Sequence, residues 1–237
     1  RLDVDAPTAH LVWQTLAGVG RISTDRLDAY LAKALREGKQ HTSWLAPDDD
    51  YEQRVLALGR EILAGGELGD AIARAVRDNR SPIRTITLAQ KLVQLTLPGV
   101  PDTYQGACQL NLTLVDPDNR SDVDFAAHQA RLARLDAGGA IESLDDEVIL
   151  VTARTLRLRR ERPELFATDY RPLELDDSLL GFARGDDVLV IVHRLAQAAP
   201  SGSVELPAGN WTDALTGYHF DGTISAADLL ATLPVAL

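Results

Sequence analysis

The chain has 237 residues, 45% of them hydrophobic and 25% charged, a composition that excludes a disordered or fibrous protein. Its formal net charge of -11 at pH 7 disfavours binding to phosphate backbones and anionic lipid, so we expect neither nucleic acid nor a membrane as a partner. No apolar run is long enough to span a bilayer, and the single cysteine, Cys108, indicates a reducing and therefore cytoplasmic compartment. Because the sequence contains no methionine, we expect that Arg1 is not the natural start of the protein.

Helical patterns dominate the first 165 residues. Apolar residues at helical spacing predict a helix over residues 8–17 and a stronger one over residues 23–38, capped by Ser23 or Thr24 and ended by Gly38. The same periodicity predicts a single short strand at 98–104 and further helices at about 46–66, 67–78, 83–96, 124–136 and 146–165.

The pattern changes near residue 165. From Tyr170 onward, short runs of β-forming residues alternate with turn dipeptides about every ten residues, which is typical of an antiparallel β-sandwich. We therefore expect an α+β chain of two domains, a mostly helical one over residues 1–165 and a β-sandwich over residues 166–237.

The stretch "LPGVPDTYQG", residues 97–106, is a candidate functional segment. If residues 98–104 form a strand, Tyr104 and Gln105 stand at its C-terminal end, where (β/α)₈ barrels carry their active-site groups. An ordinary buried strand followed by a turn at Gly106 explains the same residues.

Four aspartates crowd the stretch "LVDPDNRSDVD", residues 114–124. A calcium loop does not fit, because Arg120 stands where an oxygen ligand is needed and no glycine occupies the sixth position. A polar loop that caps the following helix is the alternative. We predict no metal site here or elsewhere in the chain.

The loop "GKQHTSWLAP", residues 38–47, combines a tryptophan with hydrogen-bonding side chains. This composition is typical of a sugar-binding site, in which an aromatic face covers the apolar face of a pyranose, although Trp44 packed into its own domain is the simpler alternative. A nucleophilic role for Ser43 is rejected, because no strand-turn-helix elbow surrounds it.

Six segments, taken in order, resemble the C-terminal portion of the maltooligosyl trehalose synthase family, which belongs to the α-amylase superfamily. The segments are "ALREGKQHTSWLAP", "LAQKLVQLTLPGVPDTYQG", "LTLVDPDNRSDVDF", "RLRRERPELF", "ELPAGNWTDALTG" and "DLLATLPVAL". The resemblance covers residues 8–237. It implies helices inserted late in a (β/α)₈ barrel, then the last barrel strand with its helix, then a C-terminal β-sandwich.

The resemblance also implies an activity. These isomerases convert the reducing-end α-1,4 bond of a maltooligosaccharide into an α,α-1,1 bond, by intramolecular transfer through an aspartate nucleophile, a glutamate acid/base and a second aspartate. No metal or organic cofactor takes part. Because the family carries the three carboxylates upstream of the region matched here, we assign no catalytic residue to this chain and expect it to be inactive alone.

Nine residues are predicted to contact the maltooligosaccharide substrate when the missing N-terminal barrel portion is present: Lys39, His41, Trp44, Tyr104, Gln105, Asp116, Asp118, Asn119 and Arg120. The last four could equally form a structural network that fixes their own loop. After "YQG" the family usually continues Thr-Glu-Leu-Trp-Asp, and the chain departs from this pattern at Cys108, Leu110 and Asn111. A catalytically silent carbohydrate-binding or scaffold module is therefore an alternative, and a protein-interaction domain is a third.

Overall fold

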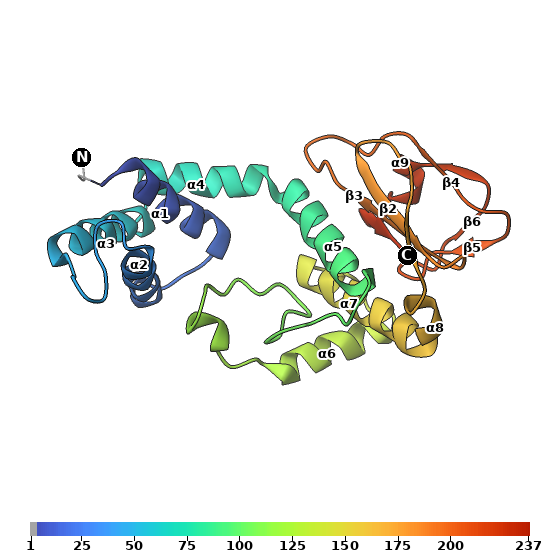
Figure 1. Cartoon of the computed structure of the whole chain (residues 1–237), viewed down its shortest axis with the longest axis horizontal. Coiled ribbons are helices and arrows are strands. Elements are labelled where there is room, and N and C mark those ends of the chain that lie inside the picture. The colour runs from blue at the N-terminus through green and yellow to red at the C-terminus, as the bar shows by residue number, and fades with distance from the viewer. Residues whose placement is uncertain (1–3) are drawn as a thin grey trace. The chain divides into compact units, whose positions relative to one another are not determined.

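The computed structural model describes residues 4–237 and has an α+β fold, about half helical, with small antiparallel sheets. The chain divides into two compact units (Figure 1). Unit 1 comprises Arg1–Asn79 and Asn111–Asp122, and unit 2 comprises Arg80–Leu110 and Val123–Leu237. Residues 4–237 contain no helix whose length and apolar content would let it cross a bilayer.

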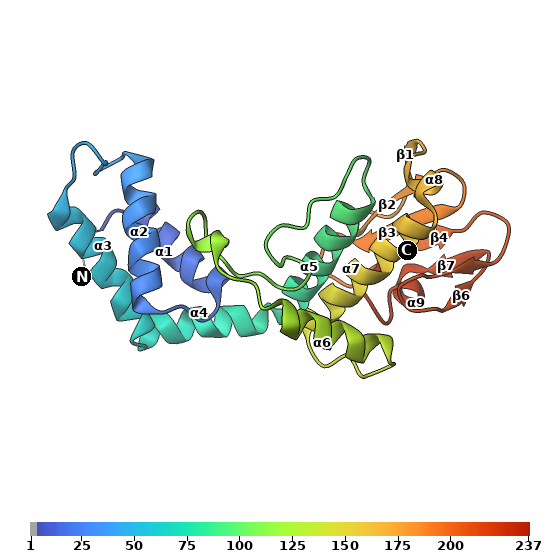
Figure 2. The ribbon, with the colours of Figure 1, turned by 90° about the horizontal axis from the view of Figure 1, so that it is seen from below.

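Unit 1 is helical. Its elements are α1 (Ala6–Val19), α2 (Thr24–Gly38), α3 (Asp49–Leu63), α4 (Glu67–Asp78) and the short 3₁₀ helix η1 (Asp118–Arg120). The first three begin at side-chain caps, in which Asp5, Ser23 and Asp48 accept a backbone N–H of the first turn. Helix α2 packs on α3 (Figure 2), and Gly59 permits this close approach, because a Cβ there would lie 3.0 Å from Leu27.

Unit 2 joins helices to β-structure. Its helices are α5 (Arg80–Thr96), α6 (Phe125–Asp136), α7 (Leu144–Glu161), α8 (Pro163–Phe166) and α9 (Ala226–Leu229). Helix α5 packs against both α7 and the central strand β3 (Figure 2).

The main sheet of unit 2 is antiparallel, with the order β1-β2-β3-β8. Its strands are Tyr170–Pro172, Leu179–Arg184, Val188–His193 and Val235–Ala236. Two small antiparallel pairs accompany it, β4 (Ser203–Glu205) with β7 (Thr223–Ser225), and β5 (Trp211–Thr212) with β6 (His219–Phe220).

The central strands β2 and β3 are buried on both faces. Because side chains alternate along a strand, Phe182 and Val190 join the apolar cluster that contains α5 and α7, whereas Leu189 and Ile191 join the cluster that contains β4 and α9. This explains why β3 is apolar almost throughout rather than alternating with polar residues.

Arg184 ends β2 inside this core, where it is 1% exposed. Its guanidinium donates to the backbone carbonyls of Thr96 (2.8 Å), Thr168 (3.0 Å) and Phe166. A single buried side chain thus ties the end of α5 to the segment that leads into β1.

The predicted helices are confirmed, with bounds that differ by a few residues, but the strand predicted at 98–104 is wrong for this chain. After Thr96 the backbone runs through bends and coil to Tyr104. A strand exists only where a neighbouring strand supplies hydrogen bonds, and among residues 4–237 no segment pairs with this one. The predicted division into residues 1–165 and 166–237, and the closure of the sheets into a sandwich, stay predictions.

Candidate functional site

The loop between α2 and α3 is built by local hydrogen bonds. Lys39 ends α2 in the left-handed conformation (φ 55°), and its N–H donates to Leu35 O at 3.2 Å. Ser43 and Ala46 then close a turn, since Ser43 N–H donates to Ala46 O (3.1 Å) and Ala46 N–H to Ser43 Oγ (3.0 Å). The turn leaves Trp44 58% exposed.

Trp44 is covered on one side by a cation. The Arg36 guanidinium carbon lies 5.0 Å from the centroid of the indole ring. Arg36 is itself fixed, because its Nε and Nη2 donate to the two carboxylate oxygens of Glu52 at 2.8 and 2.7 Å. An exposed aromatic ring held in one orientation has the form of a stacking surface.

Beneath this turn, Thr42 and Glu52 are buried, with 3% and 4% exposure. The Thr42 hydroxyl donates to Glu52 at 2.6 Å and accepts the backbone N–H of Asp48 at 2.9 Å. The Arg36 guanidinium, with the Thr42 hydroxyl, lowers the pKa of Glu52 in spite of its burial. Glu52 is therefore a charged anchor under the loop.

His41 belongs to a second polar cluster on the same loop. Its Nε2 lies 3.3 Å from the Asp5 carboxylate, and its ring centroid lies 4.5 Å from that of Tyr51. The Tyr51 hydroxyl donates to Asp5 at 2.5 Å and shares a hydrogen bond of 2.8 Å with Thr8. That hydroxyl lowers the pKa of Asp5, while burial raises the pKa of Tyr51.

A cavity of about 180 Å³ opens beside His41. Apolar side chains, among them Leu11 and Leu35, form part of its wall, and Gln40, His41 and Tyr51 bring polar groups to it. A wall of this mixed character suits a ligand with both apolar faces and hydroxyl groups, such as a sugar.

The aspartate loop is fixed by an internal ion pair of unit 1. Asp118 accepts Arg26 Nε and Nη2 at 2.6 and 2.8 Å, and it also accepts the backbone N–H of Leu114 at 2.5 Å. The Arg26 guanidinium lowers the pKa of Asp118. Asp116 and Arg120 form a more exposed pair, while Asn119 lies within η1. The carboxylate of Asp118 thus has structural partners within its own unit.

Tyr104 and Gln105 lie in unit 2, in a turn closed by Ala107 N–H donating to Tyr104 O at 2.9 Å. Tyr104 is 50% exposed, and Gln105 has a φ of 43°. Cys108 Sγ follows at 3.4 Å from His128 Nδ1. Burial lowers the pKa of the nearby Lys91.

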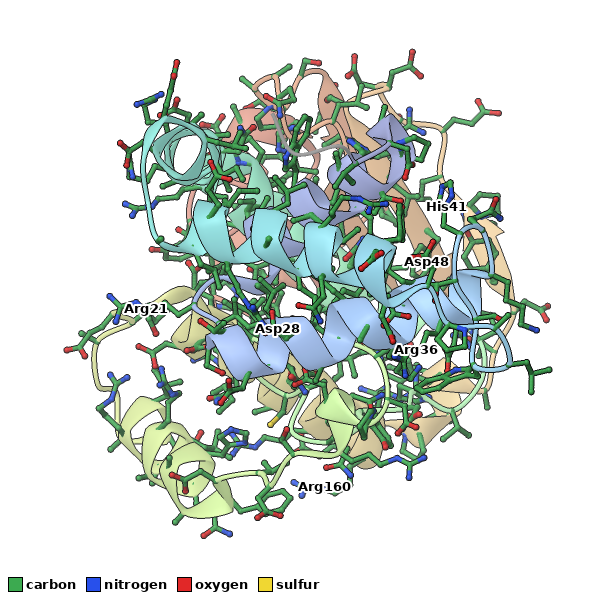
Figure 3. The ribbon with its side chains drawn as sticks, turned by 90° about the vertical axis from the view of Figure 1, so that its left-hand side faces the viewer. Arg21, Asp28, Arg36, His41, Asp48 and Arg160 are labelled. Atoms are coloured by element: carbon green, nitrogen blue, oxygen red, sulfur yellow. The ribbon has the colours of Figure 1, made fainter. Side chains whose placement is uncertain are left out.

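The structure groups the predicted residues by unit. Seven of them lie in two loops of unit 1, and Tyr104 and Gln105 lie in unit 2. The sequence did not single out Asp5, Arg36, Tyr51 or Glu52, which orient the predicted side chains. Figure 3 shows Arg36, His41 and Asp48 gathered toward one end of α2 and α3. Among residues 4–237, no group of His, Cys, Asp and Glu side chains is arranged to hold a metal ion.

Comparison with known proteins gives relatives along nearly the whole chain. Residues 169–233 match a family described as a domain of unknown function (DUF1953). The chain is 38% identical over 250 aligned positions to a putative maltooligosyl trehalose synthase of Mycobacterium tuberculosis (strain CDC 1551 / Oshkosh), an alignment that covers 98% of this chain and 31% of the relative.

Solved structures agree with this similarity. Maltooligosyltrehalose synthase from Arthrobacter ramosus matches with a TM-score of 0.88 and 36% identity, over 95% of this chain and 31% of that one. A further structure, described as a maltooligosyl trehalose synthase, matches with a TM-score of 0.81 and 26% identity, over 94% of this chain and 32% of that one. The chain thus spans about a third of the length of these relatives and corresponds to their C-terminal part.

Proposed function

We propose that the chain is the C-terminal portion of an isomerase that converts the reducing-end α-1,4 bond of maltooligosaccharides into an α,α-1,1 bond. The observation that carries the proposal is 38% identity over 98% of the chain to a putative maltooligosyl trehalose synthase, together with a TM-score of 0.88 to a solved one. The reacting carboxylates belong to the upstream two thirds of the enzyme, so this portion supplies substrate contacts and no catalytic residue. The enzyme acts in the cytoplasm, without a metal or organic cofactor.

In the whole enzyme, residues 98–104 are the last strand of a (β/α)₈ barrel. Its neighbouring strands lie in the upstream portion, and the main sheet with its two small pairs forms a C-terminal β-sandwich over residues 166–237. The sequence "LPGVPDTYQG", which resembles the last barrel strand of the α-amylase superfamily, supports the barrel assignment. Tyr104 and Gln105 then stand at the end of the strand that faces the substrate.

Lys39, His41 and Trp44 contact the sugar chain directly. Support comes from the exposed indole, from the polar groups at the 180 Å³ cavity beside His41, and from the loop that presents all three side chains. The aspartate loop lines the same substrate cleft through Asp116, Asn119 and Arg120. Asp118 fixes that loop through Arg26.

A catalytically silent carbohydrate-binding module is the second candidate. It is favoured by Cys108, Leu110 and Asn111, which stand where a carboxylate, an aromatic side chain and a further acid are expected in the family. Leu110 also donates its backbone N–H to Asp145 at 3.0 Å, so this segment is held by contacts unrelated to a sugar.

Maltopentaose separates the two candidates. The chain is mixed with the N-terminal two thirds of the Arthrobacter ramosus enzyme, expressed separately, and both binding and loss of reducing ends are measured. The isomerase proposal predicts turnover in the mixture and none with either part alone. Saturable binding without turnover in any mixture would favour the silent module, and neither binding nor turnover would contradict both.

A further inference from the structure

We infer that Arg36, Glu52 and Thr42 form a positioning network that holds Trp44 as a platform on which one glucosyl ring stacks from a single side. The inference rests on the proposed function, because it takes the ligand to be a maltooligosaccharide. It adds three residues that do not contact the sugar but determine where the contacting ring lies.

The platform itself has one free side. Arg36 occupies one face of Trp44, with its guanidinium carbon 5.0 Å from the ring centroid, yet 58% of Trp44 is exposed. A pyranose presents its C–H groups on one face, and such a face packs on an aromatic ring without losing the hydroxyl hydrogen bonds at its rim. The guanidinium shields one face of the indole from solvent and holds the ring by a cation–π contact, so its removal both uncovers that face and frees the ring.

Glu52 is the centre of the network. Its buried carboxylate accepts both guanidinium donors of Arg36 from α2 and the hydroxyl of Thr42 from the loop, while Glu52 belongs to α3. Thr42 in turn accepts the N–H of Asp48, the residue that caps α3. Two helices and the loop are thus fixed at the Glu52 carboxylate, and Thr42, two residues before Trp44 in the loop, is one of its direct partners.

Unit 1 offers a matched control for this network. A second arginine–carboxylate pair also joins α2 to α3, since Arg60 Nε and Nη2 donate to Asp28 at 2.9 and 2.5 Å. Asp28 lies farther along α2 from the loop (Figure 3). Arg60→Met also removes an ion pair between α2 and α3, although this pair is more exposed than that of Arg36 with Glu52, and only the loss of Arg36 releases the indole.

The first measurement needs no sugar. In a chain with Trp13→Phe and Trp211→Phe, acrylamide quenching of the remaining Trp44 fluorescence is compared between Arg36→Met and Arg60→Met. We expect Arg36→Met, and also Thr42→Val, to raise the quenching constant clearly, and Arg60→Met and Thr42→Ser to leave it unchanged. Circular dichroism of each variant confirms that the helices are retained.

The second measurement is maltopentaose binding to the same variants. Arg36→Met and Thr42→Val are expected to raise the Kd about tenfold, the effect of one lost charge-assisted contact. Thr42→Ser and Arg60→Met are expected to bind as the unmodified chain does, and Trp44→Ala is expected to lose binding.

If Arg60→Met and Arg36→Met weaken maltopentaose binding equally, the inference is overturned, because the loss of binding then reflects a general loss of stability in unit 1. Unchanged binding in Arg36→Met and Thr42→Val would overturn it as well, while leaving the proposed function intact. Absence of turnover in the reconstituted mixture, by contrast, contradicts the proposed function alone, provided that the variants still differ in binding.

Discussion

Asp146 gives the sharpest stability prediction, because its charge is buried and fully paired. The residue lies in the first turn of α7, and its side chain is 1% exposed. Burial alone would raise its pKa, but the Glu142 N–H at 2.8 Å and the guanidinium groups of Arg134 (2.7 Å) and Arg131 (2.8 Å) outweigh burial. The pKa of Asp146 falls from 3.8 to about 2.

This lowered pKa sets both the size and the sign of the effect. A carboxyl whose pKa falls by this amount on folding contributes about 2 kcal/mol to the free energy of unfolding. The contribution is complete above the unfolded-state value of 3.8 and disappears as the pH falls towards 2. Asp146→Asn is therefore expected to lower the free energy of unfolding of unit 2 by about 2 kcal/mol at pH 7. Below pH 4 this difference between the variant and the unmodified chain becomes smaller as the pH falls.

Urea unfolding at several pH values measures this deficit. Trp211 fluorescence, in a background with Trp13→Phe and Trp44→Phe, reports unit 2 alone. Asp136→Asn is the control, because Asp136 also forms a two-point pair with an arginine of α7 but is 45% exposed. A deficit for Asp146→Asn that stays constant from pH 7 to pH 3, or that is absent at pH 7, would refute the reasoning.

Three further predictions concern unit 2 and are checked by the same urea titration at pH 7. Arg184→Met leaves three backbone carbonyls without their donors and is expected to cost about 3 kcal/mol; a cost below that of an exposed arginine would contradict its role in the core. Gly106 and Gly138 both have positive φ, but only at Gly106 would a Cβ lie 2.8 Å from a valine methyl. Gly106→Ala is thus expected to cost about 1 kcal/mol more than Gly138→Ala, and equal costs would argue against the contact. Leu88→Ala, at a fully buried position of α5, is expected to cost about 2 to 5 kcal/mol, whereas Ile83→Ala, 40% exposed on the same helix, should cost far less.

Local signals account for the parts of the fold that the sequence predicts well. Ser23 accepts the N–H of Arg26 at the start of α2, and the helix runs to Gly38, as its capping residues indicate. The groups that form each helix cap lie within a few residues of one another, so the sequence itself shows the spacing that predicts the cap. The strand predicted at 98–104 is wrong for the opposite reason, because a strand depends on a distant partner, no segment within residues 4–237 pairs with this one, and no local pattern records that.

The candidate site divides in the same way. The composition of residues 38–47 identifies the loop that presents His41 and Trp44, because the relevant residues are adjacent. The groups that hold the loop are farther away, and Arg36 meets Glu52 across 16 positions of sequence. Asp118 meets Arg26 across 92 positions. Charged residues on amphipathic helices are common, so nothing in the sequence distinguishes these pairs from solvent-exposed ones.

The central claim is that this chain can serve as the tail of a glucan-rearranging enzyme. Its most direct test is a hybrid in which residues 4–237 replace the corresponding C-terminal third of the Arthrobacter ramosus enzyme, incubated with maltopentaose. Proton NMR of the anomeric region follows the sugar. We predict that the reducing-end signals disappear and an α,α-1,1 signal replaces them at unchanged chain length. A correctly folded hybrid that binds maltopentaose but leaves its reducing end intact would contradict the claim.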